Sequence, residues 1–306
     1  MNARLVSKLV LALALTALIG LSSGCASGSK APGGHGLEVV AAENFWGSIA
    51  AQLGGIKVHA TSVITNPATD PHSYEPSAPD GRAFAGAKLV IVDGVGYDPW
   101  ASKLVAANPV AGRVVLTVGD LVGIKPGGNP HRWYSPGNVH QVIGEIARDY
   151  AKLDPKDAAY FRRQQALFET RGLARYKQLI ATIRRRYGGV PVGASESIFA
   201  PLAQALGLRL LTPYSFLKAI SEGTEPTAAE LTTVDSQIAS RQIKVWVFNS
   251  QNSTPDVKRI TDAARRRRIP VTTITETLQP PSARFQDWQA SQLEALMRAL
   301  AHATGR

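Results

Sequence analysis

Short aliphatic runs that alternate with amphipathic stretches constrain the fold of this chain most, because the alternation occurs twice. In the first half, Asn44–Leu53 is helix-like, and the strand-like runs are Leu37–Ala41, Val58–Ile64, Leu89–Val92 and Val114–Val118. In the second half, the strand-like runs are Val190–Gly193, Leu208–Leu211, Val245–Phe248 and Val271–Ile274. The helix-like stretches between them are Ser197–Leu206, Ala228–Ser240 and Asp256–Arg267. Strands that alternate with helices typically build sheets covered by helices. The sequence therefore predicts an α/β protein with two lobes.

A long segment without proline after its first turn separates the two halves. It opens at Asp154-Pro155 and runs to Tyr187, and its apolar residues recur at alternating intervals of three and four. We therefore predict one long helix, 154–187, that would extend about 50 Å and join the lobes. Gly172 is the position at which such a helix could break or bend, because glycine costs up to about 1 kcal/mol relative to alanine.

The first 24 residues have the pattern of a signal peptide. Arg4 and Lys8 precede the uncharged run Leu9–Leu21, which is too short for a membrane span of about 20 residues and ends in small residues. The chain's single cysteine, Cys25, follows at once. It stands where bacterial lipoproteins carry the thiol that receives diacylglycerol. This resemblance implies cleavage before Cys25 and a lipid anchor on it.

Residues 25–36 comprise the predicted lipidated cysteine and a flexible tether. The tether is rich in Gly, Ser, Pro and Ala and has no periodicity, so we expect folding to start near Leu37. A lone cysteine excludes an internal disulfide.

The formal net charge of +11 needs a partner or a structural reason. Much of the excess lies in the runs Arg184–Arg186 and Arg265–Arg268, each at the end of a helix-like segment, where cations offset the helix dipole. A nucleic-acid-binding role would require a recognition motif, or basic residues interleaved with stacking aromatics, and we predict no such role. An anionic membrane surface would be a better match for the excess charge.

Two loops contain nearly the same motif, an Asx residue followed by proline, histidine, any residue and an aromatic. They are Asp70–Tyr74 and Asn129–Trp133. Proline stiffens the loop that carries the histidine, and the aromatic can shield the imidazole from water. Neutral imidazole is a good ligand for Zn²⁺ and an acceptable one for Mn²⁺ or Fe²⁺. We therefore predict that His72 and His131 bind one metal ion, whereas His35, His59, His140 and His302 lack this context.

Several motifs resemble those of the zinc- and manganese-binding lipoproteins of bacterial ABC importers. The motifs are Asp70–Pro76, Asp93–Trp100, Asn129–Trp133, Leu153–Pro155, Ala194–Phe199 with Gly207-Leu208 after it, and Gly223–Thr227. The likeness covers essentially the whole chain after Cys25.

The resemblance implies the architecture and the role. It implies two Rossmann-like lobes, 37–153 and 188–306, joined by one long backbone helix, with a metal site in the cleft between them. It also implies an extracytoplasmic binding protein, anchored to the cell membrane, that delivers zinc or manganese to a permease and its ATPase. Such a protein is not an enzyme.

The remaining ligands are also carried over from the resemblance. Family members place histidine or glutamate just after the first strand of the second lobe, where this chain has Glu196. They usually place aspartate after the last strand, where this chain has the longer Glu276. Two histidines and two carboxylates suit Zn²⁺ or Mn²⁺ as the bound ion, and Fe²⁺ is a less favoured candidate.

Alternative functions use the same residues. A zinc-dependent hydrolase would use three of these ligands and the other glutamate as general base, yet the chain has no His-Glu-x-x-His motif. A binding protein for a metal chelate such as haem or cobalamin is a further alternative, although paired proline-histidine loops and two glutamates favour a bare ion. An additional adhesin role stays open.

Overall fold

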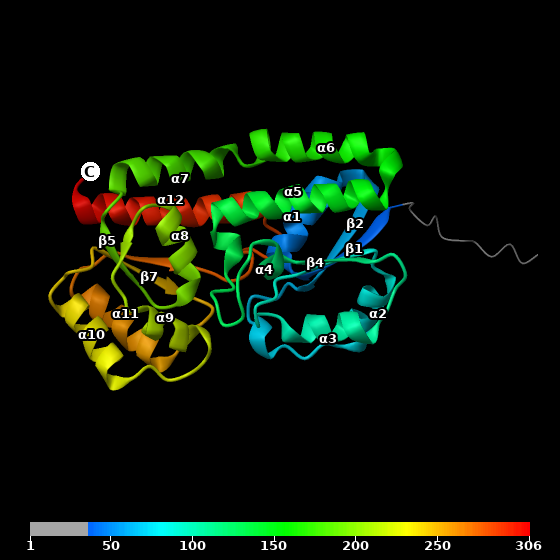
Figure 1. Ribbon diagram of the computed structural model, residues 1–306. Coiled ribbons are helices and arrows are strands. Elements are labelled where there is room, and N and C mark those ends of the chain that lie inside the picture. Colours follow the sequence, from blue (N-terminus) through cyan, green and yellow to red (C-terminus); the bar gives the residue numbers. More distant parts are fainter. Residues whose placement is uncertain (1–35) are drawn as a thin grey trace, which may run out of the picture. The chain divides into compact units, whose positions relative to one another are not determined.

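A computed structural model describes residues 36–306, and its strands form two four-stranded parallel sheets (Figure 1). The predicted signal peptide, Cys25 and nearly all of the tether lie outside the described residues.

The first sheet contains β1 (Leu37–Glu43), β2 (Val58–Ile64), β3 (Leu89–Val92) and β4 (Val114–Thr117), in the order β2-β1-β3-β4. Alternate residues of β1 enter opposite cores: Val39 packs on one face of the sheet and Val40 on the other. A sheet covered on both faces needs apolar side chains in both directions, which explains why the central strand β3 is a continuous aliphatic run, whereas the edge strand β2 is only partly buried.

Helices cover both faces of this sheet. On one face lie α1 (Asn44–Gly54), α5 (Pro136–Leu153) and α6 (Ala158–Leu167), and on the other lie α2 (Ala78–Gly86) and α3 (Pro99–Ala107). Short elements fill the connections: η1 (Gly55–Lys57), η2 (Pro71–Ser73), α4 (Val118–Leu121), η3 (Arg132–Tyr134) and η4 (Pro155–Asp157).

The second sheet repeats this topology. Its strands are β5 (Pro191–Ala194), β6 (Arg209–Leu210), β7 (Val245–Asn249) and β8 (Val271–Ile274), in the order β6-β5-β7-β8. The helical elements are η6 (Ser197–Phe199), α8 (Ala200–Ala205), α9 (Tyr214–Ser221), α10 (Ala228–Ala239), α11 (Pro255–Arg266) and α12 (Phe285–Thr304). The prediction of two α/β lobes is confirmed.

The connector between the lobes is helical along nearly its whole length, but its α-helical pattern is interrupted. After α6, residues Phe168–Gly172 form a π-helical turn, η5, and α7 (Ala174–Tyr187) follows. The Leu173 amide donates to the Phe168 carbonyl, five residues back, at 2.8 Å. A Cβ on Gly172 would lie 2.9 Å from the Phe168 ring, so glycine allows this ring to pack inside the turn. The irregular turn therefore occurs at the glycine that the sequence marks.

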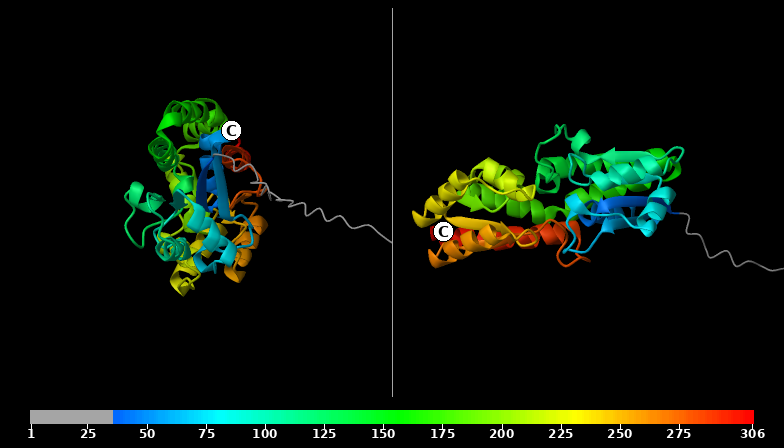
Figure 2. Two further views of the ribbon diagram at one scale, coloured as in Figure 1. Left: turned by 90° about the vertical axis from the view of Figure 1, so that its right-hand side faces the viewer. Right: turned by 90° about the horizontal axis from the view of Figure 1, so that it is seen from below.

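The connector contacts both lobes. Helix α6 packs on α1 and α5 of the first lobe, whereas α7 packs on α12 of the second. The lobes lie side by side along this helical layer (Figures 1 and 2). Across residues 36–306, no helix has both the length and the apolar character needed to cross a bilayer.

Candidate metal site

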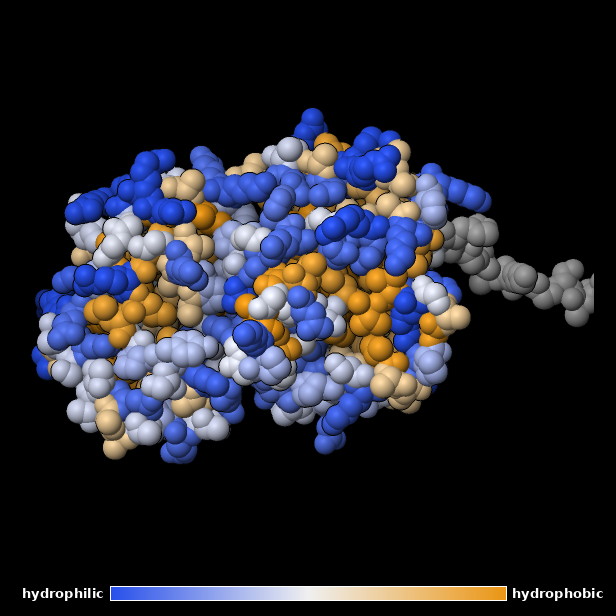
Figure 3. Space-filling model, in the orientation of Figure 1, coloured by the Kyte–Doolittle hydropathy of each residue, from blue (hydrophilic) through white to orange (hydrophobic). Residues whose placement is uncertain are grey.

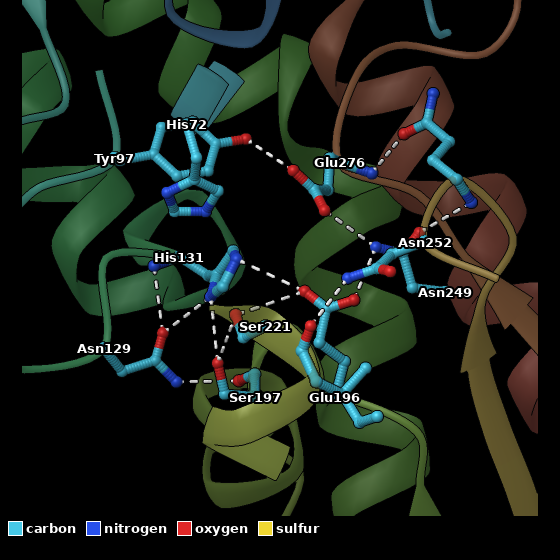
Figure 4. Close-up of polar contacts among 12 residues, drawn as sticks. His72, Tyr97, Asn129, His131, Glu196, Ser197, Ser221, Asn249, Asn252 and Glu276 are labelled. Carbon is cyan, nitrogen blue, oxygen red and sulfur yellow. Dashed lines mark hydrogen bonds and ion pairs between the residues drawn. The ribbon is translucent and has the colours of Figure 1, made fainter. Parts of the chain in front are cut away.

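Polar side chains gather where the strands of the second sheet end. Glu196 lies two residues after β5, Asn249 ends β7 and Glu276 lies two residues after β8. In parallel sheets the carboxyl ends of neighbouring strands share one edge, which is where α/β folds place their ligands. The loop that carries His131 reaches this edge from the first lobe (Figure 4).

His131 presents one free nitrogen to this edge. Its Nδ1 lies 2.8 Å from the Asn129 side-chain oxygen, an acceptor, so Nδ1 carries the proton and Nε2 is left with a lone pair. Within the described residues, the buried Nε2 has no hydrogen-bond partner. It faces Glu196 Oε1 at 3.7 Å. Burial, reinforced by His72 nearby, holds the pKa of His131 well below its usual value, so the ring is neutral and suited to bind a cation.

The Asx residue of each repeated loop has the same local role. Asn129 Oδ1 accepts a hydrogen bond from the His131 amide at 3.0 Å, and Asp70 Oδ1 accepts one from the His72 amide at 2.9 Å. Asn129 also donates to the Ser197 carbonyl at 2.7 Å, which ties the His131 loop to the second lobe. In both loops the repeated motif therefore forms an Asx turn that fixes the backbone position of the histidine.

Two buried carboxylates complete the cluster. Asn249 Nδ2 donates to Glu196 at 2.8 Å and to Glu276 at 2.9 Å. The Tyr97 hydroxyl donates to the other oxygen of Glu276 at 2.9 Å. One donor atom each from His131, Glu196 and Glu276 lie within 4.8 Å of one another. Tetrahedral zinc with bonds of about 2.1 Å separates its ligand atoms by about 3.4 Å, so the 3.7 Å between His131 and Glu196 requires only a small contraction.

The electrostatics of the cluster favour a cation. Burial, followed by repulsion from Glu276, raises the pKa of Glu196 to about 8. Burial also raises the pKa of Glu276, against an opposing effect of His72. Near neutral pH the cluster therefore retains a proton on Glu196, and a divalent ion would displace it.

His72 lies at the mouth of the cluster. It is half-buried, its ring meets Tyr97 edge-on at 4.9 Å between centroids, and its Nδ1 is 3.3 Å from the Gly96 carbonyl. It lines a cavity of about 350 Å³ together with Asp70 and Glu276. The structure thus brings three of the four predicted ligands together and leaves His72 beside them.

The other described histidines lie apart from the cluster. His59 and His140 are exposed and lie 2.9 Å and 3.4 Å from Glu38 and Glu169, and His302 is exposed near the C-terminus. His35 lies outside the described residues.

The residues that position the ligands were not predicted from the sequence. Tyr97 lies in the Asp93–Trp100 motif, to which no role was assigned. Asn249 could have been found as a polar residue at the end of a buried strand, between the two strands that carry the glutamates. Ser221, which donates to Glu196 at 3.3 Å, has no comparable signal in the sequence.

A second group of carboxyl groups lies buried in the first lobe. Asp98 accepts from the amides of Asp93 and Gly94, both at 2.7 Å, and Asp93 accepts from Trp46 at 3.0 Å. Neither oxygen of Glu43 has a hydrogen-bond partner among residues 36–306. Burial, followed by the charges of Asp98 and Asp93, raises the pKa of Glu43 well above its usual value, so Glu43 is neutral. This group does not belong to the donor cluster of His131.

Two α/β lobes with histidine and carboxylate donors buried between them define a class of two-lobed ligand-binding proteins. Residues 39–299 match the family model described as zinc-uptake complex component A, periplasmic, and the chain belongs to this family. The resemblance noted in the sequence is thereby confirmed. So is the prediction that the protein is not an enzyme, because the family is that of an uptake-complex component.

Curated relatives carry names with different metals. The chain is 29% identical over 173 residues to the iron-binding protein YfeA of Yersinia pestis, covering 53% of this chain and 54% of that one. It is 26% identical over 150 residues to the manganese-binding lipoprotein MntA of Halalkalibacterium halodurans, covering 47% and 49%. The match therefore spans about half the length of these relatives.

Solved structures share the fold. A Mn-bound periplasmic metal-binding protein from Candidatus Liberibacter asiaticus has a TM-score of 0.71 at 20% identity, covering 86% of this chain and 98% of that one. A crystal structure of ZnuA has a TM-score of 0.68 at 23% identity, covering 88% and 99%.

Proposed function

We propose that this protein captures a divalent transition metal between its two lobes and delivers it to a membrane permease of the ABC type. The observation that carries the proposal is the buried, unpartnered Nε2 of His131, which faces two buried carboxylates. A buried polar atom without a partner is costly, and a bound cation would satisfy it.

His131, Glu196 and Glu276 form the preorganised part of the proposed site. His72 supplies the fourth ligand by a small movement of its loop, because its Nδ1 is turned toward the Gly96 carbonyl and its Nε2 is available for the ion. Two ligands then come from each lobe, so the ion cross-links the lobes.

The proposed cargo is zinc or manganese, and iron is a less favoured candidate. Two imidazoles and two carboxylates form a mixed nitrogen and oxygen shell that accepts all three. Relatives named for manganese, zinc and iron are compatible with such a shell.

The proposed location is outside the cytoplasm, at the cell membrane, with an anchor on Cys25. Two relatives are named as lipoproteins, which supports this part of the proposal. Mass spectrometry of the protein from its native membrane would test it, because lipidation predicts a mature chain that begins at a diacylated Cys25, and a chain with unmodified Cys25 would contradict it.

Metal titration of the chain from Gly36 onward tests the binding role. We expect His131→Ala to weaken Zn²⁺ and Mn²⁺ binding by at least about a hundredfold, more than the loss of an outer-shell partner produces. His59→Ala is the matched control, because His59 is an exposed histidine of the same lobe. Equal affinities in both variants would contradict the proposal.

A further inference from the structure

The positive charge of the chain is concentrated in four segments, 183–195, 236–255, 263–275 and 295–306. Together they contain eleven of the 34 Lys and Arg residues and no Asp or Glu. The remaining 23 basic residues equal the acidic residues in number, so these segments carry the entire formal charge of +11.

The four segments come together at the end of the second lobe where strands β5, β7 and β8 begin and helices α7 and α12 end, and we call this end the basic tip. Lys244 donates its amide to the Pro191 carbonyl at 2.8 Å, and the Trp246 amide donates to Pro270 at 2.9 Å, so the starts of β5, β7 and β8 are adjacent. Tyr187 donates its hydroxyl to the Arg306 carbonyl at 3.3 Å, which joins the ends of α7 and α12. Hydrophilic residues dominate this left-hand end of the molecule in Figure 3.

A cavity of about 320 Å³ lies within the basic tip. Its lining includes Arg241 and Lys244 from the loop before β7, Arg268 from the loop before β8, and His302 from α12. All four are exposed, and none forms an ion pair within residues 36–306. By contrast, Arg265 in the last turn of α11 pairs with Asp262 at 2.8 Å.

Helix dipoles do not account for this arrangement. A dipole favours a cation in the last turn of its own helix, as with Arg184–Arg186 in α7. Arg241 and Arg268 instead follow the ends of α10 and α11 with φ of 54° and 57°, a left-handed conformation that favours glycine. Lys244 lines the same cavity as both arginines, and no carboxylate within residues 36–306 pairs with any of the three. An anion held in the cavity would supply the missing counter-charge.

We propose that the basic tip docks on the anionic phospholipid surface of the membrane, with the cavity holding one headgroup phosphate. Guanidinium groups match phosphate in a bidentate manner, and cations spread over a whole surface fit many phosphates in a plane better than one acidic peptide. The proposal rests on the proposed location at the membrane, which would bring this surface within reach of the headgroups.

Docking at the basic tip leaves the metal site open. Lys244 precedes β7 and Asn249 ends it, so the tip and the metal cluster lie at opposite ends of the same strands. Metal binding and membrane docking can therefore be measured separately.

Vesicle sedimentation of the chain from Gly36 onward, which forms one compact unit, tests the proposal. We expect binding to phosphatidylcholine vesicles that contain phosphatidylglycerol and none to phosphatidylcholine alone. The tip variant combines Arg241→Asn, Lys244→Gln and Arg268→Asn, because asparagine tolerates a positive φ. One Lys or Arg near an anionic surface contributes about fivefold in affinity, so the variant should lose at least about tenfold.

A control variant of equal net charge combines Lys103→Gln, Lys156→Gln and Arg162→Gln, three exposed residues outside the tip. It should keep its vesicle affinity, and both variants should keep their affinity for Zn²⁺. Equal losses in the two variants, or equal binding of the unmodified chain to both kinds of vesicle, would overturn the proposal. Binding of inorganic phosphate by the unmodified chain, without binding to vesicles that contain phosphatidylglycerol, would overturn it in favour of a small-anion site.

Discussion

Asn249 bridges the two buried glutamates, donating one amide hydrogen to Glu196 at 2.8 Å and the other to Glu276 at 2.9 Å. The two carboxylates come from strand ends on either side of β7, and the asparagine at the end of that strand holds both. The spacing of the acidic donors is therefore set by an uncharged residue that need not contact the ion.

Replacing Asn249 by leucine should weaken metal binding without removing a proposed ligand. The substitution keeps the size of the side chain but takes a donor from each glutamate, and loss of such outer partners typically costs about 10–100-fold in metal affinity. Isothermal titration with Zn²⁺ would measure the loss. Asn108→Leu, at the end of α3, is the control and should bind as the unmodified chain does.

Metal affinity should increase as the pH rises from about 6 to about 9. The ion requires ionised glutamates, and the pKa of Glu196 is raised to about 8 by burial and by Glu276, so protons compete with the metal below that pH. Calorimetry in buffers of different ionisation enthalpy should detect proton release on binding. Affinity that is flat over this range, with no proton release, would show that the carboxylates are already ionised.

Metal should stabilise the unmodified protein and not the His131→Ala variant. An ion that binds only the folded state adds about 4 kcal/mol at a thousandfold excess over Kd. Thermal unfolding with and without Zn²⁺ or Mn²⁺ would record the shift. His72→Ala should retain part of it, because His72 lies beside the cluster rather than inside it. A full shift in His131→Ala would be inconsistent with a ligand role for His131.

Glu43→Gln should stabilise the metal-free protein increasingly as the pH rises above the usual glutamate pKa of 4.5. The pKa of Glu43 is raised in the folded state, chiefly by burial, so between the two pKa values the folded state binds more protons than the unfolded state. The stability present below the unfolded pKa is therefore lost as the pH rises toward the folded pKa. Glutamine cannot ionise, so the free energy of unfolding of the variant should decline less between pH 5 and pH 8. Urea titrations would measure the free energy of unfolding at each pH. An equal decline with pH in the variant and the unmodified protein would argue against a neutral Glu43.

The two-lobed fold could be predicted because short β-branched or aliphatic runs alternate with amphipathic stretches in both halves of the chain. The fully buried Leu89–Val92 is an uninterrupted aliphatic run, and both it and the β-branched run Val271–Ile274 were predicted with the ends that the structure shows. Helix α5 was not predicted, although Ser135-Pro136 is a helix-start signal and its apolar residues recur at helical spacing. The π-helical turn at Phe168 depends on the packing of one ring, although Gly172 marks its place.

The candidate site could be predicted in part for a similar reason. The Asx-proline-histidine motif can be recognised from the sequence, because the Asx residue, the proline and the histidine that they position are consecutive. The bridging by Asn249, the hydroxyl of Tyr97 and the meeting of Arg241 with Arg268 depend on strand order and lobe contact. No single stretch of sequence records those relationships.

Anomalous diffraction from crystals loaded with Zn²⁺ or Mn²⁺ would be the most decisive test of metal capture between the lobes. We predict one strong peak between them, about 2.0–2.2 Å from His131 Nε2 and from carboxylate oxygens of Glu196 and Glu276, with His72 moved in to complete the shell. A metal peak elsewhere, with His131 and both glutamates unliganded, would contradict it.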